Sequence, residues 1–352
     1  MNIEKISIKE VRIEKTPELN EIIKMMKEYG NIDNAYSLLP SKPYHVVSFQ
    51  INNTDSAFAN ALRRILVEEI TVYSMTIEEP NILTDDEFIS GMKKVLLKNL
   101  ALMPINQEHN MLDGDLKINL HVANNTNDII DVFSSDIKVF NGKKDISEEL
   151  ITYPNIVIMR LRPGKYLNLR EVYIQSGRAY EHYGYFSLLN STMYKPLDIT
   201  PYDQFTKQGQ KSMEVDCSKF MLGFTTCGNI TPKSVINKMT DKLEYDLLDI
   251  KAKVTKYSES DAGDYYSGDG CDVEIKNDVY NYKFPGHYIS VVGAIAMRCY
   301  RLDPNILFCT SRVDRFDSMI GYIRLKHASP NKLLLAAIDA CLEDLGRIND
   351  SF

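Results

Sequence analysis

The chain has 352 residues, enough for two or three domains, and 44% hydrophobic and 25% charged residues, as is typical of a globular protein. A formal net charge of −7 argues against a protein whose main task is to hold a phosphate backbone, because that task requires a basic surface. No apolar run approaches the length that spans a bilayer, and residues 1–14 lack the apolar region of a signal peptide. We therefore expect an intracellular protein without a membrane contact.

The six cysteines include no C-x-x-C pair, so the spacing of a zinc knuckle is absent. No cysteine precedes Cys217, and several of the six lie within apolar runs. We expect buried free thiols in a reducing compartment, with no metal site and no cofactor.

The first part of the chain predicts two strands and a helix. Residues 3–14 and 44–52 alternate as strands do, and a short helix with a following loop is expected between them, over 16–42. From residue 52 to residue 70 the chain predicts a helix, which begins after a run of capping side chains at 53–56. Apolar residues repeat at helical spacing on one face of this helix, namely Phe58, Ala61, Leu62, Ile65 and Leu66.

The middle of the chain predicts one helix and several strands. A strand is expected over 71–78, a helix over 85–100, and strands of a separate small sheet over 116–122 and 128–140. The clearest hairpin spans 155–174 around the turn pair Pro163-Gly164. Residues 193–210 are rich in proline and polar residues and predict an irregular surface segment.

The remaining elements predict an internal repeat. A strand over 214–225 precedes a long helix, which begins with a capping hydroxyl at Thr231 and a proline at its first position. After an acidic linker, a strand, a helix, two strands and a helix that opens at Ser329-Pro330 follow. The order strand–helix–strand–strand–helix thus occurs twice, which predicts two copies packed as a pseudo-twofold dimer.

The string from Asn53 to Leu66, with Ala59-Asn60-Ala61-Leu62-Arg63-Arg64 at its centre, resembles the first helix of the assembly subunits of multisubunit RNA polymerases. That family comprises the bacterial alpha amino-terminal domain, its archaeal D-type counterpart and the eukaryotic third-largest subunit. Pro163-Gly164 resembles the family's Leu-x-Pro-Gly-Gln segment. Residues 176–183 are similar to its Gly-x-Gly-Lys-x-His loop but lack the second glycine.

The second copy resembles the smaller partner family, which comprises the archaeal L-type polypeptide and the eukaryotic eleventh subunit. The similarity runs from Gly286-His287-Tyr288 through the last helix, with Val292-Gly293-Ala294 where that family has Leu-Gly-Asn. A chain that fuses both types looks like the corresponding subunits of large cytoplasmic DNA viruses.

The resemblance implies an α+β fold with two dimerisation units that form a pseudo-dimer in one chain, the first interrupted by an inserted β-rich domain. The expected domains are 1–115 with 214–256, the insertion 116–213, a linker 257–270, and the second unit 271–352. The residues expected to hold the two units together are apolar, namely Phe58, Leu62, Ile65, Leu66, Val292, Ile295 and Leu342.

The resemblance also implies a non-catalytic subunit that captures the second-largest and then the largest polymerase subunit, with small zinc-bearing subunits alongside. No direct sequence-specific contact with nucleic acid is expected. The site of action is the host cytoplasm or the virion if the chain is viral, and otherwise the nucleus. The residues expected to contact partner subunits are Asn60, Arg63, Arg64, Pro163, Gly164, Gly177, Arg178 and His182.

Two other classes of function stay open. A free-standing hydrolase or transferase would use His182 with Glu181 and Ser187 and the acidic residues of the insertion, although no Gly-x-Ser-x-Gly motif is present. A ligand-binding homodimer would use the same repeated unit. The aspartates within 257–270 lack the spacing of a calcium loop, so they are interpreted as parts of a solvated linker.

Overall fold

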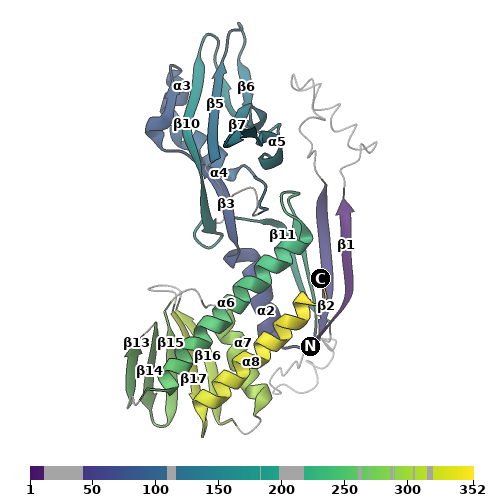
Figure 1. The fold of residues 1–352 in the computed structure, drawn as a ribbon, viewed down its shortest axis with the longest axis vertical. Coiled ribbons are helices and arrows are strands. Elements are labelled where there is room, and N and C mark those ends of the chain that lie inside the picture. The colour runs from purple at the N-terminus through teal and green to yellow at the C-terminus, as the bar shows by residue number, and fades with distance from the viewer. Residues whose placement is uncertain are drawn as a thin grey trace, which may run out of the picture.

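The computed structural model describes residues 1–11, 43–108, 116–182, 184–197, 218–260, 264–268, 270–285, 288, 290–303, 306–314 and 320–352 (Figure 1). The helix and loop predicted over 16–42 lie outside these ranges. Helices and strands are both abundant, in agreement with the predicted α+β class. Among the described helices, none combines the length and the apolar character needed to cross a membrane.

The first sheet is antiparallel and has the order β1-β2-β12-β11. The segment predicted to be irregular from residue 193 is in fact strand through Pro196, because β11 pairs with β12 along its whole length. A helix follows β2 and is extended by one π-helical turn, and a longer helix follows β12. These elements are β1 (Asn2–Val11), β2 (Tyr44–Asn52), α2 (Ser56–Arg64), η2 (Ile65–Glu69), β11 (Leu189–Pro196), β12 (Lys219–Thr226) and α6 (Pro232–Ser258).

The second sheet has the order β13-β14-β15-β17-β16, with helices after β15 and after β17. Its edge strand β13 falls within the predicted linker 257–270, and α6 also continues to Ser258, so part of that segment is regular structure. Tyr266 of β13 packs on Tyr257 of α6 with ring centroids 5.2 Å apart. These elements are β13 (Tyr265–Gly268), β14 (Cys271–Lys276), β15 (Val279–Phe284), α7 (Val291–Leu302), β16 (Phe308–Asp314), β17 (Ile320–Lys326) and α8 (Pro330–Asn349).

The two sheets share one arrangement. The order β1-β2-β12-β11 has its counterpart in β14-β15-β17-β16. In each sheet one helix, α2 or α7, follows the first two strands of this order, and the elements from β3 (Thr71–Thr76) to β10 (Tyr166–Arg178) intervene between α2 and β11. Both end in a long helix that begins with a hydroxyl residue and a proline. Thr231 caps α6 as predicted, since its hydroxyl accepts from the Ser234 N–H at 3.3 Å, whereas Ser329 makes no such side-chain bond at α8.

A third, distal lobe (residues 73–174) lies at the opposite end of the molecule from the second sheet (Figure 1). Its main sheet has the order β3-β10-β5-β7-β8, with β4 on β10, and β6 pairs with β9. The helix predicted over 85–100 is two helices divided at Met92. The strands are β3 (Thr71–Thr76), β4 (Ile82–Thr84), β5 (Leu116–Ala123), β6 (Ile130–Phe133), β7 (Ile137–Asn141), β8 (Lys144–Asp145), β9 (Val157–Leu161) and β10 (Tyr166–Arg178). The helices are α3 (Glu87–Gly91), α4 (Lys93–Leu102) and α5 (Ser147–Leu150), with short 3-10 turns at Glu79–Asn81 and Ser134–Asp136.

The hairpin predicted around Pro163-Gly164 is wrong in its pairing, although both strands and the turn exist. β9 pairs with β6, and β10 pairs with β5, so the two strands that flank the turn belong to different sheets. The turn is bonded instead to Asn124 at the end of β5, whose carbonyl accepts from the Gly164 N–H at 2.8 Å. Gly164 has φ +68°, a conformation that glycine adopts without strain.

Apolar side chains form two cores. One lies between the two sheets of the repeated arrangement and the helices α2, α6, α7 and α8, and the other fills the distal lobe. Residues 75–105 contribute to the distal core, so the packing divides the chain near 72 and again near 174–186 rather than at 115 and 213. The predicted domain boundaries themselves stay a prediction. Four free cysteines are buried, as expected of structural thiols: Cys271, Cys299, Cys309 and Cys341.

The distal lobe is fastened to the start of α6. The Glu108 carboxylate accepts from the Thr231 N–H at 2.9 Å and from the Ser234 hydroxyl at 2.8 Å. A carboxylate at this position also suits the positive end of the helix dipole. The Lys238 ammonium lies 5.8 Å from the ring centre of Tyr73, which adds a cation–π contact between α6 and β3.

Candidate subunit interface

Helices α2 and α7 lie against each other, and α6 lies beside α8 (Figure 1). The apolar residues predicted to join the two repeated units all contribute to the single core that these helices share. Six are at most 3% exposed, and the seventh, Leu342, is partly buried against the same core. The structure therefore brings together the seven residues Phe58, Leu62, Ile65, Leu66, Val292, Ile295 and Leu342.

The ends of the two long helices cross over reciprocally. Tyr257, near the end of α6, packs on Tyr282 of the second sheet with ring centroids 6.1 Å apart. Phe352, which follows α8, packs on Phe49 of the first sheet with centroids 5.1 Å apart. Each sheet is therefore covered in part by the helix that follows the other sheet.

A buried ionic cluster joins α2 to α7 and α8. Asp55 caps α2, since one of its oxygens accepts from the Phe58 N–H at 2.7 Å, and its other oxygen lies 3.5 Å from the Arg298 guanidinium. Arg298 is also 2.7 Å from Asp344 of α8. Burial raises the pKa of Asp55, while the Phe58 N–H and the nearby arginines act in the opposite direction. Arg301 completes the contact by donating to the Thr54 carbonyl at 3.0 Å.

A second buried cluster lies at the other end of α2. Glu69, which is 3% exposed, accepts a hydrogen bond from the Ser290 hydroxyl at the start of α7. Its second oxygen lies 3.9 Å from Lys242 of α6, which also pairs with Asp246. Burial raises the pKa of both Glu69 and Asp246, and the Lys242 ammonium opposes the shift in each case.

Two lysines of α6 make further polar contacts along the same boundary. Lys253 donates to Asp249 at 2.6 Å and to the Tyr288 hydroxyl at 2.6 Å, and Lys251 pairs with Asp339 of α8 at 2.5 Å. These lysines extend from the repeated unit that contains the first sheet to the unit that contains the second. Polar contacts therefore flank the apolar core on several sides.

Part of the predicted partner surface is assembled beside η2. Arg64 pairs with Glu68 at 3.5 Å, and the Glu68 carbonyl accepts from the Tyr180 N–H at 3.3 Å. The loop 177–182, whose first two residues end β10, therefore lies next to the helix. Arg178 donates to the Tyr180 hydroxyl at 3.1 Å, and Arg63 donates to Asn60 at 2.9 Å.

Gly177 and His182 take distinct parts in this loop. A Cβ atom on Gly177 would lie 2.3 Å from the Phe186 ring, so the glycine is required for close packing rather than for a special backbone angle. His182 is exposed and stacks on Tyr185 with ring centroids 3.5 Å apart.

Pro163 and Gly164 are not part of that surface. They precede β10, whereas Gly177 is near its far end. A strand of 13 residues extends roughly 40 Å at about 3.3 Å per residue. Both residues are exposed at the tip of the distal lobe, so they form a separate surface from Arg64 and its loop.

The charged residues that join α2 to α7 are not among the predicted site residues. The sequence pattern indicates only a helix cap at Asp55, and it indicates no role for Glu69, Arg298 and Asp344. One signal is present: Asp246 and Asp344 occupy the same place in the two long helices, counted from Pro232 and Pro330. Both interrupt an apolar stripe, and both are buried.

The contacts of the hydrolase candidate residues do not form a catalytic dyad. The Ser187 hydroxyl donates to the Leu189 carbonyl at 3.3 Å, and Glu181 accepts from the Arg178 N–H at 3.0 Å, so neither bond is to His182. Within the described ranges, no group of three or more His, Cys, Asp and Glu side chains is placed to hold a metal ion.

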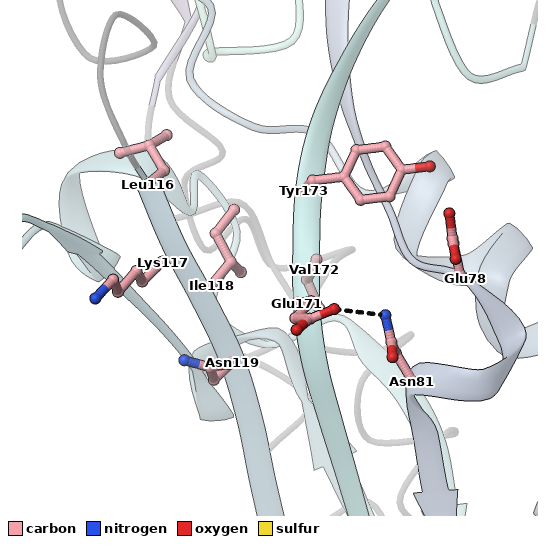
Figure 2. A pocket seen from close by; sticks show the side chains of 9 residues that line it. All are labelled: Glu78, Asn81, Leu116, Lys117, Ile118, Asn119, Glu171, Val172 and Tyr173. Atoms are coloured by element: carbon pink, nitrogen blue, oxygen red, sulfur yellow. Dashed lines mark hydrogen bonds between the residues drawn. The ribbon is translucent and has the colours of Figure 1, made fainter.

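A pocket of about 520 Å³ lies on the distal lobe, away from this loop. Figure 2 shows its lining of mixed polar and apolar side chains, with Glu171 bonded to Asn81 at 3.1 Å. Glu171 has φ +57° at the irregularity where β10 shifts its pairing with β5. The pocket contains two carboxylates, Glu78 and Glu171, but His182 does not line it. Its geometry therefore does not connect it to the hydrolase hypothesis.

Comparisons with known proteins relate the chain to RNA polymerase subunits. Residues 48–247 match the model of the RNA polymerase Rpb3/Rpb11 dimerisation domain. The chain is 27% identical over 208 residues to the DNA-directed RNA polymerase RPB3-11 homolog of an African swine fever virus isolate from a tick in Malawi. It is 27% identical over 209 residues to the homolog of an isolate from a pig in Kenya. Each alignment covers 57% of this chain and 55% of the relative, so the chain spans about half the length of these relatives. The family model matches more than half of the chain, and the chain therefore belongs to the RNA polymerase Rpb3/Rpb11 dimerisation-domain family.

Proposed function

We propose that the chain is a non-catalytic assembly subunit of a multisubunit DNA-directed RNA polymerase and that it contains an Rpb3-type and an Rpb11-type unit in one polypeptide. The names of the viral relatives support this proposal, since they are RPB3-11 homologs. The observation that carries it is the repeated order of strands and helices, with α2 packed on α7 and α6 beside α8.

In this proposal the two units form an internal pseudo-dimer, and the distal lobe is an insertion in the first unit. Burial of apolar surface contributes roughly 25 cal/mol per Å², which favours pairing, and the covalent connection reduces the entropy cost of association. The ionic clusters around Asp55 and Glu69 add polar contacts at both ends of α2. The family matched over residues 48–247 is itself named for dimerisation.

The proposed partners are the two largest polymerase subunits, with small zinc-bearing subunits beside them. Arg64 and the loop 177–182 form one contact surface, since the Tyr180–Glu68 bond holds them together. Pro163 and Gly164 form another at the tip of the distal lobe. The planar guanidinium groups of Arg63, Arg64 and Arg178 suit partner carboxylates and carbonyls. The site of action in a virus would be the host cytoplasm or the virion.

Affinity capture of the tagged chain from its native source tests this proposal. We expect stoichiometric recovery of two very large subunits that carry polymerase catalytic motifs, and no catalytic activity of the chain alone. Recovery of the chain only as a free monomer or homodimer would refute the proposal. Turnover of a substrate by the isolated chain would favour the hydrolase alternative.

A further inference from the structure

Strand β16 forms one end of the second sheet and pairs with β17 alone among the described strands (Figure 1). It extends over seven residues, Phe308–Asp314. The outer edge of such a strand presents backbone N–H and C=O groups that readily pair with another extended chain. This edge is therefore a candidate surface for strand addition.

The hydrogen bond of Cys309 shows which backbone N–H groups of β16 point away from the sheet. Its N–H donates to the Tyr300 hydroxyl of α7 at 2.9 Å instead of to β17. Because hydrogen-bonding direction alternates along an antiparallel strand, the N–H groups of Ser311 and Val313 also face away from β17. The outward N–H of Cys309 is thus bonded to Tyr300, and the N–H groups of Ser311 and Val313 are two further outward donors.

Exposed apolar side chains flank this edge. On the helix side, Met297, Tyr300 and Leu302 of α7 are 39%, 43% and 45% exposed. At the start of the strand, Leu307 is 75% exposed and Phe308 is 38% exposed. The Tyr300–Cys309 bond places the helix and the strand in contact, so the exposed side chains of α7 lie beside this edge, whereas Phe308 lies on the opposite face of the strand from Cys309. An exposed apolar patch of this kind marks an interaction surface.

The other face of the edge is charged and includes two arginines and one carboxylate, Asp314. Phe308 and Arg312 share a face of β16 because they are four residues apart, and Arg324 is on the same face since it pairs across the sheet with Thr310. The Arg324 guanidinium lies 6.0 Å from the centre of the Phe308 ring. Arg312 and Arg324 are both exposed, whereas Ser311 faces α7, with its hydroxyl 3.8 Å from the Cβ position of Gly293.

We propose that β16 accepts an added strand from another polypeptide, an extended segment that alternates apolar residues toward α7 with acidic residues toward Arg312 and Arg324. Main-chain hydrogen bonds supply affinity in this mode of recognition, and the alternate side chains supply specificity. A second copy of β16 offers one carboxylate, Asp314, on this face, so it complements the arginines less well than an acidic segment does. The proposal does not depend on Arg64 or on the loop 177–182.

Binding of a labelled peptide of alternating glutamate and valine to the full chain tests this proposal. Fluorescence anisotropy is expected to show saturable binding, and a lysine–valine peptide should bind at least about tenfold more weakly because it places like charges opposite the arginines. Absence of binding by the glutamate–valine peptide, or equal binding of both peptides, would overturn the proposal.

Ser311→Pro is the decisive variant. It removes an outward N–H, and proline is tolerated at such a position of an edge strand. We expect an affinity loss of at least about tenfold, whereas Ser311→Ala, which keeps the N–H, should bind within about twofold of the unmodified chain. Equal affinity of Ser311→Pro and Ser311→Ala contradicts strand addition. Self-association of the free chain that Ser311→Pro abolishes would assign the edge to a second copy instead.

Arg312→Glu provides a second test that does not alter the backbone. It should weaken binding of the glutamate–valine peptide and strengthen binding of the lysine–valine peptide, so that the preference between the two changes by about tenfold or more. An unchanged preference would contradict the proposed acidic partner. Thermal unfolding of each variant establishes that it is folded. If Ser311→Pro does not fold, Arg312→Glu alone tests whether β16 binds an acidic strand.

Discussion

Arg298 lies 3.5 Å from Asp55, although the two residues belong to different repeated units and are separated by most of the chain. The Arg298 side chain is 11% exposed, and Asp55 is 2% exposed. Removing one member of a buried pair leaves the other charge without compensation, which is more costly than the pair itself is stabilising. This contact therefore makes the boundary between the units sensitive to single substitutions.

Arg298→Ala should lower the free energy of unfolding by about 3–5 kcal/mol, because it removes the cation that pairs with the buried Asp55 carboxylate. Urea unfolding measures the change. Arg347→Ala is the matched control: Arg347 also pairs with Asp344 at 3.0 Å but is 52% exposed, so its loss should cost at most about 1 kcal/mol. Equal effects of the two variants would show that the Arg298 cluster is not a buried determinant of stability.

Glu69→Gln should change how stability depends on pH. The pKa of Glu69 is raised above its ordinary value of 4.5 by burial, so the folded state binds a proton that the unfolded state releases. The stability of the unmodified chain relative to Glu69→Gln should therefore fall as pH rises from 4.5 through the raised pKa, and then level off. Urea unfolding over a pH series measures this difference. A difference that rises with pH over that range would mean that burial does not dominate at Glu69.

Gly177→Ala should destabilise the protein by about 1–3 kcal/mol, because the added Cβ would meet the buried ring of Phe186 at 2.3 Å. Gly346→Ala is the control, since no atom lies within 4 Å of its Cβ position in α8. That substitution should stabilise the helix by up to about 1 kcal/mol. Thermal unfolding compares the two. A neutral Gly177→Ala variant would mean that the loop moves away from Phe186 without cost.

Arg64→Ala should leave the isolated chain folded, because its i,i+4 pair with the half-exposed Glu68 contributes only about 0.5 kcal/mol or less. If Arg64 contacts a large subunit, the variant should lose about 2–5 kcal/mol of assembly free energy. Titration of the isolated partner into the two forms of the chain measures this loss. Arg160→Ala on the distal lobe, whose side chain is 73% exposed, is the control and should assemble normally. Equal assembly of Arg64→Ala and the unmodified chain would show that Arg64, whose side chain is 13% exposed, makes no contact with that partner.

Local patterns predicted most of the elements but not all of their pairings. The helical spacing of Phe58, Leu62 and Ile65 predicted a buried face, and Thr231-Pro232 predicted the start of α6, since both signals are contained in one turn or one stripe. The turn at Pro163-Gly164 predicted a hairpin, yet β9 pairs with β6 and β10 pairs with β5, and both partner strands are distant from the turn in sequence.

The charged residues between the two repeated units could not be predicted from local sequence patterns. A lone arginine or glutamate in an amphipathic helix is normally solvated, so Arg298 and Glu69 carried no distinguishing signal by themselves. Their burial depends on Asp55 and Ser290, which belong to the opposite repeated unit in each case. Only the matching positions of Asp246 and Asp344 in the two long helices hinted that buried charges recur at this boundary.

Pairing of the two units within the chain is tested most directly by cutting it. A protease site placed in residues 261–263 separates the first unit and the distal lobe from the second unit, and it leaves β13 joined to β14. After cleavage without denaturant, size-exclusion chromatography should show one species at the elution volume of the intact chain, containing both fragments in a one-to-one ratio. Fragments that elute separately, or that each pair with themselves, would contradict the internal dimer.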